Sequence, residues 1–115
     1  SILEIDAEVE LAELGGEFPQ WVFTLEPFGA SNRQPMFLTR RAQVLEMRRI
    51  GKTGQHLNLR LGQGDHQWTA LAFNQSERWI DGTSTVDFVY TLIKDHWQGV
   101  ERLNLKVLDF QASKP

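Results

Sequence analysis

Two Asp–His pairs are the residues of this sequence that come closest to a metal-ligating arrangement. They are Asp65–His66 and Asp95–His96, and a carboxylate with an imidazole can hold a divalent metal that activates water. Adjacent residues of a strand or turn point in different directions, so each pair supplies one ligand at best. Both pairs lie in predicted loops, where polar residues need no special reason. We therefore expect neither a metal site nor a cofactor in this chain.

Other catalytic motifs are missing from the sequence. The chain has no cysteine, which excludes disulfides, thiolate nucleophiles and cysteine-ligated zinc. It also contains no G-x-S-x-G, no H-E-x-x-H and no complete phosphate-binding loop. The segment GKTG at 51–54 lacks the upstream glycine and the following helix of such a loop, so we interpret it as a hairpin turn. We expect the chain to be non-enzymatic.

The charges are distributed unevenly along the chain. The net charge is −3, but residues 1–26 contain seven carboxylates and no lysine or arginine. Residues 40–60 instead contain six basic residues and a single acidic one, Glu46. On charge alone, this basic segment fits two interpretations equally well: a solvated sheet edge that resists aggregation, and a surface that binds phosphates.

The composition indicates a folded protein with one domain. A length of 115 residues, with 41% hydrophobic and 23% charged residues, is typical of a globular domain. No segment approaches the roughly 18 apolar residues of a membrane-spanning helix, and the acidic first residues do not resemble a signal peptide. We expect a soluble, cytoplasmic protein with no membrane partner. The missing initiator methionine suggests a piece of a longer protein.

Five segments have the pattern of β-strands. Residues 56–62 and 102–110 alternate clearly, with one apolar face each. Residues 68–74 and 84–93 are also strand-like, and the imperfect alternation of residues 36–51 predicts a bulge. Six side chains of the two clearest strands are predicted to be buried: Leu57, Leu59, Leu61, Leu103, Leu105 and Val107. The turns are expected at GKTG (51–54), GQGD (62–65) and HWQGVE (96–101).

Short helices are predicted before and within this set of strands. Asp6 is expected to cap a helix that ends at Gly15–Gly16. Residues 17–28 form a second candidate, with Phe18, Trp21, Val22 and Leu25 at helical spacing. Between the third and fourth strands, Ser76 is expected to cap one helical turn that presents Trp79 and Ile80. We interpret Trp21, Trp79 and Phe28 as packing residues that fasten helices and linker to the strands.

The order of elements predicts a mainly β fold, a five-stranded OB-fold Greek-key barrel with an N-terminal helical linker segment. Three strands in a meander, a helical break and two further strands match that plan. An open β-sandwich is the alternative, which we disfavour because five strands close more naturally into a small barrel. We expect residues 1–35 to form an acidic helical or irregular linker that packs on the barrel, and residues 36–115 to form the barrel.

Several segments, in this order, resemble the C-terminal OB domain of RecJ, the bacterial single-strand-specific 5′-to-3′ DNA exonuclease of the DHH superfamily. They are IDAEVELAEL, LEPFGASNRQPMF, HLNLRL, ALAFNQ, VDFVYTL, WQG and LNLKVLDF, between Ile5 and Phe110. The family loop usually reads P-F-G-x-G-N-P-x-P, and this chain has Ser31 for the second glycine and Arg33 for the first proline. The usual Asn-x-Trp-x-Gly also differs here, although Trp97 and Gly99 are retained.

The resemblance implies that this chain is one module of a longer exonuclease used in DNA repair and recombination. A hydrolase of that superfamily needs clustered aspartates and histidines that hold two divalent metals, Mg or Mn, and these ligands must lie upstream in the parent protein. The implied partners are single-stranded DNA, the rest of the exonuclease chain and the acidic, phenylalanine-ended tail of single-strand-binding protein. A purely steric role, in which the barrel completes the exonuclease ring, also stays open.

Binding of single-stranded DNA is the main functional hypothesis, because OB folds combine a basic groove with aromatic side chains on which bases stack. The candidate residues are Arg48, Arg49, Lys52, His56, Asn58, Arg60, Lys94, His96 and Trp97. Trp97 is the best stacking candidate because a tryptophan in a turn has little core to fill. Arg48 and Arg49 are consecutive, so only one of them shares the face of Asn58 and Arg60.

Two further aromatic residues, Trp68 and Phe73, have opposite parity in their predicted strand, so about one of them should belong to the core. The net charge is negative, and only the predicted hairpin around GKTG, within residues 40–60, is basic. Binding of single-stranded DNA is therefore expected to be weak and to show little sequence preference.

Overall fold

Strands make up most of the computed structural model, which describes residues 3–115 of the chain. Ser1 and Ile2, which the expected linker segment includes, lie outside the described residues. In chain order the elements are β1 (Ala7–Glu8), η1 (Leu11–Leu14), α1 (Phe18–Phe23), β2 (Phe37–Ile50), β3 (His56–Gln63), β4 (His66–Ala72), η2 (Ser76–Arg78), β5 (Thr85–Trp97) and β6 (Val100–Ala112).

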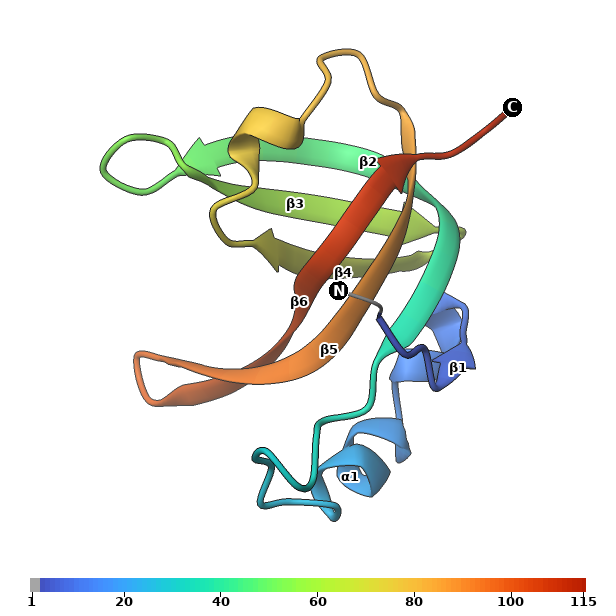
Figure 1. The fold of residues 1–115 in the computed structure, drawn as a ribbon, viewed down its shortest axis with the longest axis vertical. Helices are drawn as coiled ribbons and strands as arrows, with labels where there is room; N and C mark the ends of the chain where they lie inside the picture. Colours follow the sequence, from blue (N-terminus) through green and yellow to red (C-terminus); the bar gives the residue numbers. More distant parts are fainter. Residues whose placement is uncertain (1–2) are drawn as a thin grey trace.

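Five of the strands close into a barrel, which confirms the predicted OB fold (Figure 1). The strand order is β1-β2-β3-β4-β6-β5, and a further pairing between β2 and β5 closes the ring. The pairings within the barrel are antiparallel except that of β4 with β6, which is parallel and short. Turns at the predicted positions join β2 to β3, β3 to β4 and β5 to β6, and η2 provides the predicted helical break. Ser76 does not cap this turn as expected: it is the first residue of η2, and Gln75 occupies the N-cap position without a side-chain cap.

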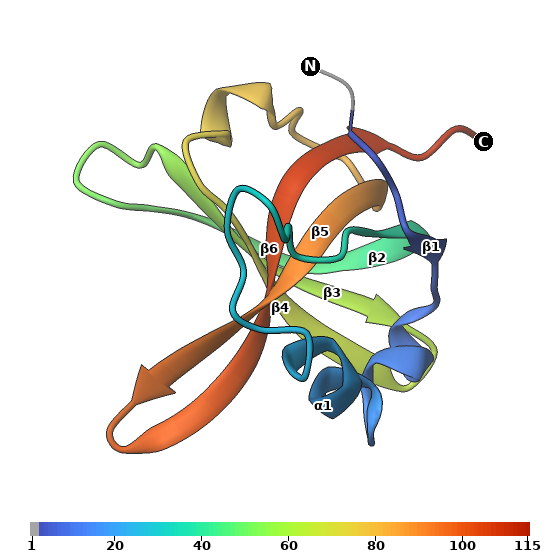
Figure 2. The same cartoon turned by 60° about the horizontal axis from the view of Figure 1, so that its bottom comes forward.

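The hairpin of β5 and β6 extends well beyond the barrel. Figure 2 shows its far end projecting away from the other strands. The two strands remain paired out to Trp97 and Val100, so the turn between them is shorter than the sequence predicted. Because this end has no core beneath it, Leu103 is half-buried and not buried as expected. The other five residues of the predicted core set are buried, among them Leu59 and Leu105.

Two irregularities bend β2, as its imperfect alternation predicted. The register shifts between Thr39 and Ala42 in the pairing with β5, and between Val44 and Glu46 in the pairing with β3. At the first irregularity, Arg41 has a positive φ of 56°, which costs free energy in a residue with a side chain. Its N–H donates to Asp87 Oδ1 at 2.8 Å, so a carboxylate from β5 holds the bend of β2 in place.

The carboxyl group of Asp87 is a partly buried anchor. Burial by itself raises its pKa, but the hydrogen bonds from Ser113 Oγ and Arg41 N–H, with the charges of Arg40 and Arg41, outweigh this effect and lower the pKa below its usual value. Ser113 lies just after β6, so the same carboxylate also joins the end of the chain to the bend in β2.

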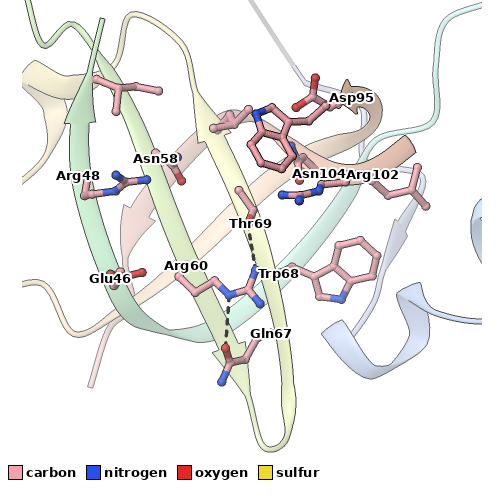
Figure 3. Close-up of a pocket in the computed structure, with 14 residues that line it drawn as sticks. Glu46, Arg48, Asn58, Arg60, Gln67, Trp68, Thr69, Asp95, Arg102 and Asn104 are labelled. Atoms are coloured by element: carbon pink, nitrogen blue, oxygen red, sulfur yellow. Dashed lines mark hydrogen bonds between the residues drawn. The ribbon is translucent and has the colours of Figure 1, made fainter. Parts of the chain in front are cut away.

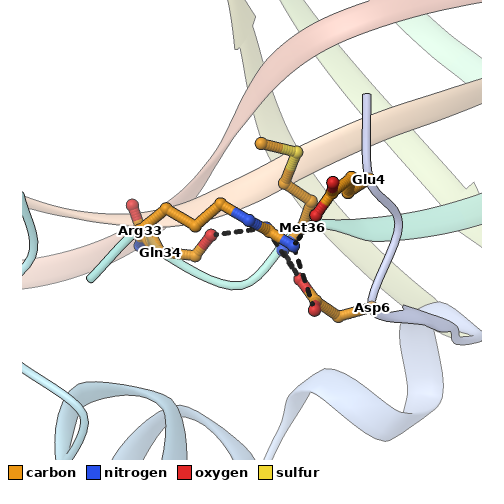
Figure 4. Close-up of polar contacts among 5 residues, drawn as sticks. All are labelled: Glu4, Asp6, Arg33, Gln34 and Met36. Atoms are coloured by element: carbon orange, nitrogen blue, oxygen red, sulfur yellow. Dashed lines mark hydrogen bonds and ion pairs between the residues drawn. The ribbon is translucent and has the colours of Figure 1, made fainter. Parts of the chain in front are cut away.

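The N-terminal segment contradicts one part of the sequence prediction. Asp6 does not cap a helix; residues 7–8 form β1, which pairs in parallel with the start of β2, and η1 begins after Glu10. Asp6 instead accepts the Met36 N–H at 2.8 Å and forms an ion pair with Arg33 at 3.1 Å (Figure 4). The hydrogen bond from Met36, aided by Arg33, lowers the pKa of the Asp6 carboxyl despite its partial burial.

The N-terminal segment shares its apolar core with the barrel. Leu11, Leu14 and Val22 are fully buried within the same cluster as the barrel leucines. A buried polar chain adds to this contact: the Tyr90 hydroxyl lies 2.7 Å from Thr39 Oγ1, which donates to the Val9 carbonyl oxygen at 2.8 Å. Because Thr39 has a single hydroxyl proton, Tyr90 is the donor to Thr39.

The predicted packing aromatics differ in their environments. Trp79 is buried and Phe28 packs against the core, as predicted. Trp21, however, is 56% exposed, because α1 is only six residues long and turns Val22 and not Trp21 towards the core. Ile80, beside Trp79, is also exposed. Within residues 3–115, no helix has both the length and the apolar character that a membrane span requires.

The role of Asp87 leads to a first prediction. Asp87→Ala should lower the free energy of unfolding by about 1–3 kcal/mol, because the Arg41 N–H and the Ser113 hydroxyl lose their acceptor. Its lowered folded-state pKa means that the Asp87 contribution is present above the ordinary value of 3.8 and is lost as the pH falls through the folded value. Urea unfolding at neutral pH and below pH 4 checks both expectations.

Asp65→Ala is the matched control for this test, since Asp65 lies exposed in the turn between β3 and β4. It should leave the unfolding midpoint nearly unchanged. Equal stability of Asp87→Ala and wild type at neutral pH would show that Asp87 does not anchor the bend.

Candidate nucleic-acid interface

An open groove with a volume of about 950 Å³ runs between the outer face of β2, β3 and β4 and the projecting hairpin of β5 and β6 (Figure 3). Four of the predicted site residues line it: Arg48, Asn58, Arg60 and Trp97. Its other lining residues are Glu46, Ile50, Gln67, Trp68, Thr69, Leu71, Asp95, Arg102, Leu103 and Asn104. The groove therefore brings together residues from both ends of the barrel sequence.

Strand alternation and register place the polar residues of the barrel wall. In β3, Leu57, Leu59 and Leu61 point into the core, so the residues between them point outwards. Arg48 is paired with Asn58 across β2 and β3, and Arg60 is paired with Thr69 across β3 and β4. Directly paired residues share a face of the sheet, and these polar side chains consequently lie on one face of the barrel wall, where Glu46 is paired with Arg60 and Leu71 with Asn58.

Arg60 is held flat against this wall. Its Nη1 donates to Thr69 Oγ1 at 2.9 Å and its Nε donates to Gln67 Oε1 at 3.3 Å. Both acceptors are neutral, so these bonds orient the guanidinium without neutralising its charge. The remaining N–H groups of the guanidinium are left for a ligand.

The hairpin supplies the aromatic wall of the groove. Trp97 is 53% exposed near its end, and the guanidinium carbon of Arg102 lies 4.8 Å from the centre of the indole ring. Asp95 is paired directly with Arg102 across β5 and β6, and Figure 3 shows both reaching the groove from this hairpin. Arg102 and Asp95 were not predicted as site residues, because the sequence does not fix the β5–β6 register.

The arginines of the groove differ from most other arginines of the protein in their partners. Arg33, Arg40, Arg49 and Arg78 each form an ion pair with a carboxylate. Within residues 3–115, none of the three groove arginines, Arg48, Arg60 and Arg102, has a carboxylate within 4.0 Å. The groove therefore holds three guanidinium groups that no ion pair within residues 3–115 neutralises.

The second irregularity of β2 determines which of the consecutive residues Arg48 and Arg49 faces the groove. It lies between Val44 and Glu46, and it leaves Arg48 on the groove face. Arg49 points to the other side, where its Nη2 lies 3.9 Å from Asp81 Oδ1. Lys52 is exposed in the turn between β2 and β3 and does not line the groove.

Three other predicted site residues also lie outside the groove. His56 Nδ1 accepts the Asn74 N–H at 2.9 Å, and its ring packs edge-on against Phe73. Lys94 and His96 occupy the opposite face of the hairpin from Trp97. Lys94 Nζ lies 3.7 Å from Glu26 Oε1 and 4.3 Å from the centre of the Phe23 ring, and His96 Nε2 lies 3.5 Å from Glu101 Oε2.

Trp68 and Phe73 lie in different environments, and the adjacent Asp95 and His96 point in different directions. Trp68 is half-buried against the core and also lines the groove, whereas Phe73 is 42% exposed beyond the end of β4. Asp95 and His96 point to opposite faces of the hairpin. Among residues 3–115, no group of three or more His, Cys, Asp and Glu residues is arranged to hold a metal ion.

Comparisons with known proteins agree with the OB fold. A family model described as the RecJ OB domain matches residues 5–109. Two solved structures of RecJ from Thermus thermophilus are similar. The one in complex with Mn²⁺ is 29% identical, with a TM-score of 0.62, and the match covers 86% of this chain and 14% of that chain. The one in complex with Mg²⁺ is 28% identical, with a TM-score of 0.63, and the match covers 91% of this chain and 15% of that chain.

A protein described as a putative aspartyl-tRNA synthetase from Leishmania major Friedlin shares the fold at 18% identity, with a TM-score of 0.61 over 90% of this chain and 20% of that one. A comparison with curated proteins found no match. The chain thus corresponds to about one seventh of the length of the RecJ structures that it resembles.

Proposed function

The chain belongs to the RecJ OB domain family, and from this membership we propose that it is a non-catalytic module that binds single-stranded DNA in the groove between the barrel wall and the β5–β6 hairpin. In this proposal the module holds the substrate of a longer, RecJ-like exonuclease. The outer face of strands β3 and β4 and the adjoining loops form the surface that OB folds use for oligonucleotides.

One observation carries the proposal: three arginines without ion-pair partners among residues 3–115 share a single groove with an exposed tryptophan. Arg48 and Arg60 on the barrel wall would contact successive phosphates, and Arg60 is already oriented by Thr69 and Gln67. Trp97 on the opposite side would stack against a base. A basic track with a stacking platform is the combination that binds single strands with little dependence on base order.

Catalysis belongs elsewhere in this proposal. The parent exonuclease would hold Mg²⁺ or Mn²⁺, the ions bound in the two similar RecJ structures, in a core that this chain does not contain. The module would act in the cytoplasm with the rest of that chain, in repair and recombination. Its contribution would be substrate affinity and not hydrolysis, so we expect no nuclease activity from this chain with either metal.

A second candidate ligand is the acidic, phenylalanine-ended tail of single-strand-binding protein. Ile50, Leu71 and Leu103 line the groove together with the arginines, and an acidic peptide with an apolar end would contact both kinds of side chain. We favour DNA because the groove is open and lined by three separate arginines, whereas one terminal phenylalanine needs a single apolar pocket.

The salt dependence of binding provides a second prediction. If the three groove arginines each contact a phosphate, the logarithm of affinity for oligothymidylate should fall with the logarithm of salt concentration at a slope of about −2, at roughly 0.7 per contact. Arg48→Ala should make the slope shallower by about 0.7, since one contact is lost. Fluorescence anisotropy titrations at several salt concentrations measure this slope.

Arg49→Ala is the matched control, because it removes the same charge from the neighbouring residue that points away from the groove. It should leave the slope nearly unchanged. Equal effects of the two substitutions would contradict the groove as the binding site. No binding to oligothymidylate at low salt, together with affinity for an acidic phenylalanine-ended peptide, would favour the protein ligand.

Stacking provides a third prediction. Trp97→Ala should weaken binding by about 1–3 kcal/mol and leave the salt slope unchanged, because stacking releases no counterions. Trp21→Ala is the matched control: Trp21 is exposed to a similar degree, 56% against 53%, but lies on α1 outside the groove. The two variants should therefore differ in affinity in the same anisotropy assay, and an equal loss of affinity in both would argue against stacking on Trp97.

A further inference from the structure

The groove contains two carboxylates, which a surface for phosphates alone does not explain. Glu46 lies on β2 and Asp95 lies on β5. Within residues 3–115, neither carboxylate has a cation within 4.0 Å. A free carboxylate repels a polyanion, so each weakens binding unless it accepts a hydrogen bond from the ligand.

Asp95 is the carboxylate that lies beside the stacking platform. It precedes Trp97 by two residues in β5, so the two side chains project from the same face at a spacing of about 7 Å. Its cross-strand partner Arg102 does not neutralise it, because the guanidinium lies over the indole ring of Trp97 instead. Because Arg102 covers one face of the indole, a base would stack on the other face, beside an unpaired carboxylate.

The chemistry of the bases identifies the one that fits this arrangement. A carboxylate has two acceptor oxygens and no donor. Guanine alone presents two adjacent donors, N1–H and the 2-amino group, on its Watson–Crick edge, and it can therefore bind both oxygens at once. Thymine offers one N–H between two carbonyl oxygens, and these would be repelled by Asp95.

We propose that Asp95 and Trp97 form a subsite for guanine in single-stranded DNA, with the base stacked on the indole and its N1–H and 2-amino group donating to the carboxylate. This inference rests on the proposed function. It also changes the sequence-based expectation of little base preference, because the arginines and the indole are indifferent to the base and Asp95 is not. Glu46, on the far side of the groove, is not part of the subsite.

Anisotropy titrations of the 115-residue chain with three oligonucleotides of about 15 nucleotides test the subsite. The first is oligothymidylate, the second has isolated guanines at every third position, and the third has hypoxanthine in place of those guanines. Hypoxanthine keeps the purine ring and N1–H but lacks the 2-amino group. We expect the guanine oligonucleotide to bind about fivefold or more tightly than either of the others.

Two isosteric variants separate recognition from charge. Asp95→Asn should reduce the preference for guanine to less than about twofold, partly because the lost charge improves the affinity for oligothymidylate. Glu46→Gln removes the same charge from the same groove, and it should raise affinity for all three oligonucleotides while retaining the preference. Circular dichroism spectra confirm that both variants are folded.

Other results of these titrations would overturn the guanine subsite. Equal affinity for the guanine and thymine oligonucleotides would overturn the subsite and leave the proposed DNA-binding function standing. A preference that persists in full with hypoxanthine would overturn the proposed two-donor contact, because the 2-amino group would then contribute nothing. A preference that survives Asp95→Asn would assign it to purine stacking and overturn the role of Asp95. Absence of binding to all three oligonucleotides would overturn the proposed function and the subsite together.

Discussion

The barrel depends on the ability of β2 to pair with two strands at once. Its first half pairs with β5 and its second half with β3, so the strand must bend between its two halves. Two irregularities accomplish this turn, and Asp87 holds the first by binding the N–H of Arg41, a residue with positive φ. Bulges of this kind bend a strand and increase its twist, which is how a small sheet closes.

The groove follows from this closure. Because the second irregularity fixes the parity of the last part of β2, Arg48 joins Asn58 and Arg60 on the outer face while Arg49 turns away. The β5–β6 hairpin, continuing past the barrel, then forms the second wall and carries Trp97 and Arg102. Ion pairs neutralise most of the other arginines, so within residues 3–115 a protein with a net charge of −3 still has three arginines without an ion pair in one groove.

Local sequence patterns were sufficient to predict the barrel. The features that they did not predict depend on strand register or on contacts between residues far apart in the chain. The period-2 alternation of β3 was sufficient to place Asn58 and Arg60 on the outer face, and the position of Trp97 near a turn was sufficient to predict that it is exposed. The side of Arg48 depends on a bulge whose position alternation does not fix, and Arg102 depends on the register of β6. Asp6 was misassigned as a helix cap because its true partners, Arg33 and Met36, come about thirty residues later in the chain.

If the outer groove and the β5–β6 hairpin bind single-stranded DNA together, both walls should respond when a short oligothymidylate is added. We would follow the amide and indole chemical shifts of the ¹⁵N-labelled chain during such a titration. The largest shifts should occur at Asn58, Arg60, Thr69 and the indole N–H of Trp97, with little change around Trp21. Shifts confined to α1, or none on either wall of the groove at low salt, would rule out binding in the groove.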